Sequence, residues 1–187
     1  AKPPRGSPTQ TAAAICGVKP NWTMSRFVDE KVTEIKKLVG KERVLLGLSG
    51  GVDSTVTARL LHKAIGNQLT CVYVDTGLMR KNETEAVRDR FKKEFGIKLE
   101  IVDAKDRFLT ALAGIADPEQ KRRIIGKMFL DEFAAKAKDL GHHEFLAQGT
   151  LYTDVIESVS VKGPSQTIKS HHNRVQGVLD LIKAGRV

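Results

Sequence analysis

The sequence has few cysteines and no long apolar run, and these two absences narrow the class of protein. Cys16 and Cys71 are the two cysteines in 187 residues, so no Cys-x-x-Cys pair is present to bind zinc or relay electrons. Cys71 lies in the apolar segment 69–75, where a cysteine usually packs as a small core residue. No apolar stretch reaches the length of a membrane span, and the first ten residues lack the apolar run of a signal peptide. We therefore expect a cytoplasmic protein with no membrane partner.

An even spread of positive charge is also missing. The formal net charge is +9, but basic and acidic side chains are equal in number between residues 42 and 159, and the excess lies before and after this stretch. A basic nucleic-acid face is more often spread over the folded body of a protein. We therefore expect no nucleic-acid partner, and polyanion binding by the two ends is kept as an alternative.

The most informative segment is residues 43–54, which read RVLLGLSGGVDS. The apolar run 44–48 has the length and composition of a strand. Two glycines follow, and then Val56, Leu60, Leu61 and Ile65 recur at helical spacing. A strand, a small-residue turn and a helix N-terminus point free backbone N–H groups and a positive dipole end at an anion.

The residue types in this turn favour a phosphate group. The glycines let phosphate oxygens approach the backbone, and the hydroxyls of Ser49 and Ser54 can add donors. No lysine follows the glycines, so the turn is not a Walker loop. Asp53 would repel a phosphate unless a cation lay between them, and Mg²⁺ is the simplest choice. The alternative is a plain strand-to-helix turn in which Asp53 is a favourable first-turn charge.

The rest of the chain alternates helices and strands. Residues 1–20 read as a linker, and residues 21–187 as one domain. Thr23 or Ser25 can cap a helix that carries Phe27, Val32, Ile35, Leu38 and Val39 on one side and stops at Gly40. Further strands are expected at 69–75, 98–102 and 145–148. Further helices are expected from a near capping box at Asn82 and Glu85 to Gly96, at 108–112, from Asp117 to about Gly141 and at 175–184. His142 and His143 are assigned to capping the last carbonyls of the Asp117 helix.

This alternation predicts an α/β fold with a three-layer, doubly wound parallel sheet covered by helices on both faces. Ligands bind such sheets beyond the carboxyl ends of the strands. Small or polar residues follow three of the expected strands, at 49–51, 75–77 and 148–150. We expect these three ends to converge on one nucleotide pocket.

The second half of the chain adds charged candidates. Asp154 and Glu157 are three residues apart, so a helical turn would place both carboxylates on one face, where they could complete a Mg²⁺ site. Lys169 follows a segment, 158–167, expected to be a mobile loop, and could carry a positive charge onto the phosphates. His171 and His172 could act as donors or proton carriers. Each has an ordinary alternative as a solvated surface residue.

The sequence also resembles a known family. The turn 49–54 is similar to the Ser-Gly-Gly-x-Asp-Ser signature of the PP-loop ATP pyrophosphatases. Further blocks resemble the ATP-pyrophosphatase domain of the glutamine-hydrolysing GMP synthetase family, over roughly residues 15–187 and in family order. These blocks are ICGVKPNWTM (15–24), LLGLSGGVDS (45–54), QLTCVYVDTGLMRKNE (68–83), DPEQKRRIIG (117–126), LAQGTLYTDVIES (146–158) and TIKSHHN (167–173).

The resemblance implies a fold like that of the PP-loop adenine nucleotide alpha hydrolases and a ligase reaction in purine biosynthesis. Mg-ATP would transfer AMP to the C2 oxygen of xanthosine monophosphate (XMP) and release pyrophosphate, and ammonia would then give GMP and AMP. The implied ATP and pyrophosphate ligands are Ser49, Gly50, Gly51, Val52, Asp53, Ser54, Thr55, Val74, Thr76, Leu78, Gly149, Thr150 and Lys169. Asp53, Asp154 and Glu157 would hold Mg²⁺ and, with Lys169, support catalysis, and Arg80 would reach XMP.

Two domains of the resembled family have no counterpart in these residues. They are the glutamine amidotransferase domain, which would supply ammonia from the same or another chain, and a C-terminal domain that pairs two subunits into a dimer. The sequence departs from the family pattern at Thr76, at Thr153 and after Asn173, where Arg174-Val175 replaces a glycine-rich stretch.

Three alternative functions share part of this evidence. Another amide-forming PP-loop enzyme such as NAD synthetase shares the 49–54 turn, but the blocks at 146–158 and 167–173 favour GMP synthetase. A tRNA-modifying PP-loop enzyme would fit the basic ends, yet the catalytic cysteines usual in that class are absent. A nucleotide-binding module without enzymatic activity is the third.

Overall fold

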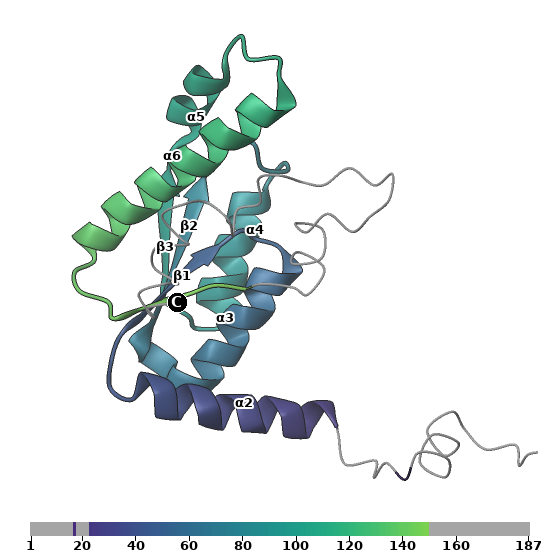
Figure 1. Cartoon of the computed structure of the whole chain (residues 1–187), viewed down its shortest axis with the longest axis vertical. Coiled ribbons are helices and arrows are strands. Elements are labelled where there is room, and N and C mark those ends of the chain that lie inside the picture. Colours follow the sequence, from purple (N-terminus) through teal and green to yellow (C-terminus); the bar gives the residue numbers. More distant parts are fainter. Residues whose placement is uncertain (1–16, 18–22, 150–187) are drawn as a thin grey trace, which may run out of the picture.

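Four apolar segments form one parallel sheet in the computed structural model, which describes residue 17 and residues 23–149 (Figure 1). The strands are β1 (Val44–Leu48), β2 (Leu69–Asp75), β3 (Leu99–Asp103) and β4 (Phe145–Ala147). Within the described residues their order is β3-β2-β1-β4, and all three pairings are parallel. Val44, at the start of β1, lies opposite Leu69 on one side and Phe145 on the other. One of the two inner strands, β1, is therefore the strand that precedes the Ser49–Ser54 segment.

The alternation of side chains along the strands creates the layers. Leu46 and Cys71 belong to the core on one face of the sheet, with residues of α2 (Met24–Val39), α3 (Val52–Ile65) and α4 (Glu83–Asp89). Leu45 and Val72 belong to the core on the other face, with residues of α5 (Lys105–Leu112) and α6 (Pro118–Asp139). Figure 1 shows α3 and α4 on one side of the strands and α5 and α6 on the other. The predicted three-layer α/β fold is confirmed.

Predicted caps set the ends of the two longest helices. The Thr23 side chain accepts a hydrogen bond from the Arg26 N–H, and α2 stops at Gly40, whose φ is 58°. The Asp117 side chain accepts from the Gln120 N–H at 2.7 Å, and Pro118 opens α6. The short 3₁₀ turn η1 (Gly66–Gln68) joins α3 to β2. These ends agree with the sequence prediction, because each depends on residues only three or four positions apart.

The predicted capping box at Asn82 and Glu85 is wrong. Asn82 adopts a left-handed conformation (φ 62°) and its side chain makes no cap hydrogen bond. A different bond forms at this end of the helix, in which Glu83 Oε2 accepts the Arg80 N–H at 2.8 Å. The helix then widens into a π-helical turn, η2 (Arg90–Glu94), in which the Phe95 N–H bonds to the Arg90 carbonyl. This turn keeps the Phe91 ring buried and brings it into an edge contact with Phe95.

Three apolar helix positions expected to face the core are exposed. Leu38 is 71% exposed and Val56 is 59% exposed, and Phe27 is partly exposed as well. The buried stripe of α2 runs through Val32 and Val39 instead. The apolar stripe of an amphipathic helix is wide, so sequence alone easily places an apolar residue at its margin on the core-facing side.

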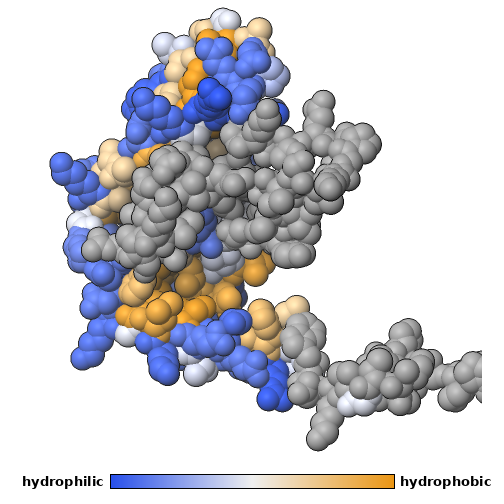
Figure 2. All heavy atoms as spheres, viewed as in Figure 1, coloured by the Kyte–Doolittle hydropathy of each residue, from blue (hydrophilic) through white to orange (hydrophobic). Residues whose placement is uncertain are grey.

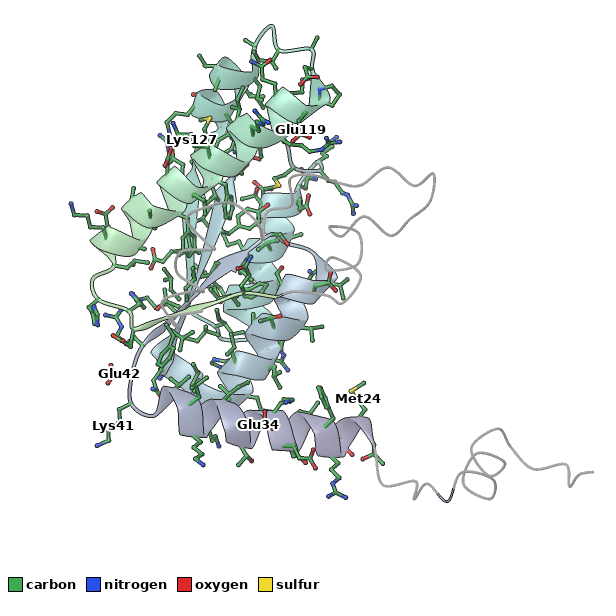
Figure 3. All side chains as sticks on the ribbon, viewed as in Figure 1. Met24, Glu34, Lys41, Glu42, Glu119 and Lys127 are labelled. Carbon is green, nitrogen blue, oxygen red and sulfur yellow. The ribbon has the colours of Figure 1, made fainter. Side chains whose placement is uncertain are left out.

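Charged side chains cover much of the outer surface. Figure 2 shows hydrophilic atoms along the outer sides of α2 and α6 and hydrophobic atoms just above α2. Figure 3 shows Glu119 and Lys127 on α6, and Lys41 and Glu42 in the turn after α2. No helix among residues 23–149 combines the length and the apolar character needed to cross a membrane.

Candidate functional site

The carboxyl ends of β1, β2 and β4 lie side by side at one edge of the sheet (Figure 1). Residues 49–51, 76–77 and 148–149 follow these strands. The three strand ends therefore lie next to one another, as predicted, and their use as one nucleotide pocket stays a prediction. Thr150, Asp154, Glu157 and Lys169, which were also assigned to this site, lie outside the described residues.

The turn between β1 and α3, residues 49–54, is called the phosphate turn below. Gly51 is the N-cap of the 14-residue helix α3, in an extended conformation and without a side-chain cap among the described residues. The Thr55 N–H makes the first intrahelical bond, to the Gly51 carbonyl at 3.1 Å. The amides of Val52, Asp53 and Ser54 precede it and have no partner within the helix. With the helix dipole, they form a site suited to an anion.

Two serine hydroxyls fix the shape of the phosphate turn. Ser49 Oγ accepts the Gly51 N–H at 3.4 Å and donates to Ser54 Oγ at 3.1 Å. Ser54 Oγ in turn donates to the Gly51 carbonyl at 3.1 Å. Both hydroxyl protons are therefore used inside the turn and not, as the sequence predicted, offered to a phosphate. The amides of Val52, Asp53 and Ser54 are left to face a ligand.

Gly50 is required at the tightest point of this turn. Its φ is +80°, a backbone conformation that residues with a Cβ rarely adopt. A Cβ at Gly50 would also lie 3.3 Å from Val87 Cγ2 and 3.4 Å from both the Tyr73 ring and Glu83 Oε1. The phosphate turn is thus packed directly on β2 and α4.

Asp53 is exposed in the first turn of α3, and it is the one predicted metal ligand within the described residues. Its carbonyl accepts the Thr57 hydroxyl at 2.9 Å. Gly149 packs on the same turn of helix, because a Cβ there would lie 2.9 Å from Thr57 Oγ1. Residues 23–149 contain no group of three His, Cys, Asp or Glu side chains that could hold a metal ion.

The turn after β2, residues 76–78, is called the β2 turn below. Thr76 is buried, and its Oγ1 accepts the Leu78 N–H at 3.3 Å. Leu78 is 48% exposed and presents an apolar side chain at the surface. Val74 is wholly buried in the core, so a ligand can reach it only through its backbone.

Asp75 is a prominent residue of this edge that the sequence analysis did not single out. Its carboxylate is buried and accepts hydrogen bonds from Thr84 Oγ1 at 2.6 Å and from the Gly77 N–H at 3.1 Å. Lys105 Nζ lies 3.2 Å from Asp75 Oδ2. Burial raises the pKa of the Asp75 carboxyl, but the bonds from Thr84, Gly77 and Lys105 outweigh it and hold the pKa below its usual value. Asp75 raises the pKa of the Lys105 amine in return.

Arg80, the residue assigned to XMP, is exposed beyond the β2 turn. Its backbone N–H bonds to Glu83 Oε2, and the other oxygen of Glu83 lies beside Gly50. Glu83 therefore links the segment that carries Arg80 to the phosphate turn.

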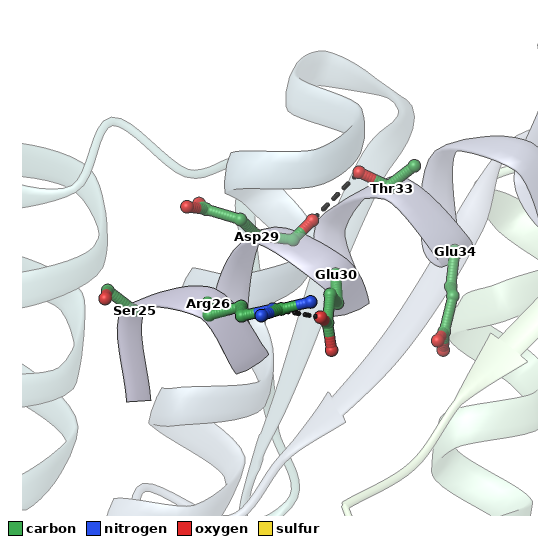
Figure 4. Close-up of a pocket in the computed structure, with 6 residues that line it drawn as sticks. All are labelled: Ser25, Arg26, Asp29, Glu30, Thr33 and Glu34. Carbon is green, nitrogen blue, oxygen red and sulfur yellow. Dashed lines mark hydrogen bonds and ion pairs between the residues drawn. The ribbon is translucent and has the colours of Figure 1, made fainter. Parts of the chain in front are cut away.

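Two hollows lie outside the phosphate turn. One, of about 570 Å³, is an open surface along α2 lined by Ser25, Arg26, Asp29, Glu30, Thr33 and Glu34 (Figure 4). Its lining residues include an Arg26–Glu30 ion pair and a hydrogen bond from the Thr33 hydroxyl to the Asp29 carbonyl. The other, of about 170 Å³, lies after β3 and is lined by residues 103–107. Neither contains residues of the phosphate turn, so we assign the site by its open amides and strand ends.

Comparison with known proteins decides the family. A family model described as NAD synthase matches residues 23–133, which include the phosphate turn and strands β1 to β3. The chain belongs to the NAD synthase family. Its members share the PP-loop fold, as the predicted resemblance to PP-loop ATP pyrophosphatases requires.

Curated relatives of the chain include GMP synthases. The chain is 60% identical over 160 residues to the glutamine-hydrolysing GMP synthase of Zymomonas mobilis, and 58% identical over 159 residues to that of Limosilactobacillus reuteri. Each match covers 85% of this chain and 30% of the relative, so the chain spans under a third of the length of these proteins. The predicted resemblance to GMP synthetase is confirmed.

Solved structures of NAD synthetases share the fold at low sequence identity. An NH3-dependent NAD synthetase from Campylobacter jejuni has a TM-score of 0.57 at 14% identity, over 74% of this chain and 62% of that one. A glutamine-dependent NAD+ synthetase from Acinetobacter baumannii, in complex with ADP, has the same TM-score at 16% identity, over 74% of this chain and 28% of that one. These likenesses establish the fold alone.

Proposed function

We propose that this chain is the ATP-pyrophosphatase part of a GMP synthase, a ligase of purine biosynthesis. The observation that carries the proposal is the 58–60% identity to GMP synthases over 85% of the chain. The open amides of the phosphate turn support it, because they supply the anion site that such a reaction needs. XMP, ATP and ammonia are the proposed substrates.

The proposed reaction has two steps. The C2 oxygen of XMP attacks the α-phosphorus of ATP, the bond to the β-phosphate oxygen breaks, and pyrophosphate leaves. Ammonia then attacks C2 of adenylyl-XMP, AMP departs with the former carbonyl oxygen, a proton is lost and GMP forms. The chain's contribution is to position the reactants and to balance the charge of the leaving pyrophosphate.

The described residues divide this work between two turns. The amides of Val52, Asp53 and Ser54 would bind phosphate oxygens together with Gly50, Gly51 and Thr55. The backbones of Val74 and Thr76, the side chain of Leu78, and Gly149 would receive the adenosine, and Arg80 would contact XMP.

The predicted Mg²⁺ fits the chemistry at Asp53. An exposed carboxylate beside an anion site is unfavourable alone and favourable with a hard cation that carboxylate and phosphate oxygens share. Asp53 would hold Mg²⁺, with Asp154 and Glu157 as further proposed ligands. The ion would withdraw charge from the phosphates, and Lys169 is the proposed additional cation. Thr150 stays a proposed ATP contact.

The remaining assignments are proposals about the whole protein. Ammonia would come from a glutamine amidotransferase domain or subunit, and two subunits would pair through a further C-terminal domain. We propose a cytoplasmic location. The assignment of residues 1–20 as a linker and 21–187 as the ATP-pyrophosphatase domain stays a prediction.

Product identification tests the proposal. The chain and a version extended by the proposed C-terminal domain are each supplied with Mg-ATP, XMP and ammonium. The extended version is expected to form AMP, pyrophosphate and GMP in equal amounts, and activity in that version alone would assign XMP binding to the added domain. A parallel reaction replaces XMP with the carboxylic acid precursor of NAD, because the match to the NAD synthase family model favours NAD synthase activity as the second candidate. Turnover of that precursor alone, or release of ADP and phosphate, would refute the GMP synthase proposal.

A further inference from the structure

The buried carboxylate of Asp75 gathers three separate parts of the chain at the carboxyl edge of the sheet. Its three partners are the Gly77 N–H in the β2 turn, the Thr84 hydroxyl in the first turn of α4, and the amine of Lys105, which is the first residue of α5. The Asp75 side chain is 3% exposed, so water cannot replace a lost donor freely. The 2.6 Å bond from Thr84 has the short length of a charge-assisted hydrogen bond.

The β2 turn also contacts the backbone at the start of α5. The Asp75 carbonyl accepts the Ala104 N–H at 2.9 Å. A Cβ at Gly77, whose φ is +73°, would lie 3.2 Å from Lys105 Cβ and 3.4 Å from its Cα. The β2 turn thus rests on the start of α5 while its preceding carboxylate is bonded to α4.

The phosphate turn is held by different bonds. Ser49, Ser54 and the Gly51 carbonyl form its internal chain of hydrogen bonds, and none of them involves Asp75. The phosphate turn also packs on α4, but through Glu83 and Val87 and not through Thr84. A change confined to the Thr84 hydroxyl should therefore alter the β2 turn and leave the amides of the phosphate turn in place.

We propose that Asp75, bonded by Thr84, is a positioning residue that fixes the β2 turn and thereby sets the affinity for the nucleoside part of ATP. This inference rests on the proposed function, in which the β2 turn receives adenosine. It separates two contributions to ATP binding, one from the nucleoside and one from the phosphates.

The test compares ATP and pyrophosphate binding by calorimetry on the 187-residue chain. Thr84→Val removes the hydroxyl and keeps the side-chain shape, Thr84→Ser restores the hydroxyl, and Thr33→Val is the matched control. Thr33 also donates its hydroxyl to an oxygen, the Asp29 carbonyl, but on α2. Loss of a hydrogen bond to a charged group should weaken ATP binding by about tenfold in Thr84→Val. Thr84→Ser and Thr33→Val should bind ATP like the unaltered chain, and all should bind pyrophosphate equally.

Lys105→Met is a second variant, because Lys105 is half exposed and methionine keeps the atoms that pack on Gly77. It should weaken ATP binding in the same direction and leave pyrophosphate binding unchanged. Unchanged ATP affinity in Thr84→Val, or an equal loss for ATP and pyrophosphate, would overturn the inference. Failure of the unaltered chain to bind ATP would contradict the proposed function itself, and the inference would fall with it.

Discussion

At the scale of single residues, the candidate site depends on Gly50 and Asp75 for different physical reasons. Gly50 supplies a backbone conformation and a close approach that a side chain would prevent. Asp75 supplies a buried charge that organises donors from two helices and a turn. Gly50 follows directly from the sequence motif, whereas Asp75 does not, because its partners Thr84 and Lys105 lie 9 and 30 positions away and carry no spacing signal.

Gly50→Ala is expected to weaken both folding and anion binding. The left-handed φ and the contacts with Val87 and Tyr73 should cost about 1–3 kcal/mol in the free energy of unfolding. Pyrophosphate affinity should fall as well, because relief of the contacts would displace the amides of the phosphate turn. Urea denaturation and calorimetry measure the two effects.

Gly96→Ala is the matched control for this substitution. Gly96 has a φ of +63°, but a Cβ there meets nothing within 4 Å. The Gly96→Ala variant should have a lower free energy of unfolding through its backbone conformation alone, and it should keep its affinity for pyrophosphate. An equal loss of pyrophosphate affinity in both variants would contradict the assigned role of Gly50.

Asp75 also predicts a pH dependence of stability. Its pKa in the folded chain is lower than the ordinary value of 3.8, so the folded state binds the proton less readily than the unfolded state. The stabilisation is therefore fully present above the unfolded pKa and is lost as the pH falls through the folded pKa. The difference in unfolding free energy between the unaltered chain and Asp75→Asn should be constant above about pH 5 and shrink below about pH 4.

Denaturation curves between pH 3 and 7 measure this difference. Asp29→Asn is the control, because Asp29 is exposed and pairs with Lys63 at the surface, where an ion pair contributes little. A difference for Asp75→Asn that stays constant down to pH 3 would contradict the network described for Asp75.

At the scale of elements, β4 and α3 are joined by a contact between two specific residues. Gly149 follows β4 and lies against Thr57 in α3, whose hydroxyl already bonds to the Asp53 carbonyl. The contact fixes the end of β4 beside the residue proposed to hold Mg²⁺. No sequence pattern predicts it, because the two positions are more than ninety residues apart.

Gly149→Ala should destabilise the chain by about 1–3 kcal/mol, because the new methyl group would overlap Thr57 Oγ1. The double variant Gly149→Ala/Thr57→Ala should recover most of this loss, since it removes the atom in conflict. Thermal denaturation of the two single variants and the double variant measures the coupling. Strictly additive effects would show that the two residues are not in contact.

At the scale of the whole molecule, the sequence predicts the layers well because local signals determine them. Neighbouring residues in the chain determine the strand lengths and the caps at Thr23 and Asp117. They also determine that the side chains of Leu45 and Leu46 lie on opposite faces of the sheet. The errors arise where tertiary contacts decide. The Asn82 side chain makes no cap bond to α4, and Glu83 bonds to the Arg80 N–H before the helix begins.

The same division applies to the candidate site. The phosphate turn is predictable, because one short segment carries its strand, its glycines and its helix start. The support of the β2 turn is not, because it forms from residues of β2, α4 and α5 that meet only in the folded sheet.

The most direct test of the two-turn site is an amide NMR titration of the chain with pyrophosphate and then with Mg-ATP. Pyrophosphate is expected to shift chiefly the amides of Gly51, Val52, Asp53 and Ser54. Mg-ATP should shift the same amides and, in addition, those of Gly77 and Leu78. Shifts confined to other parts of the chain, or the same response to both ligands, would contradict a site in which the phosphate turn holds the phosphates and the β2 turn holds the nucleoside.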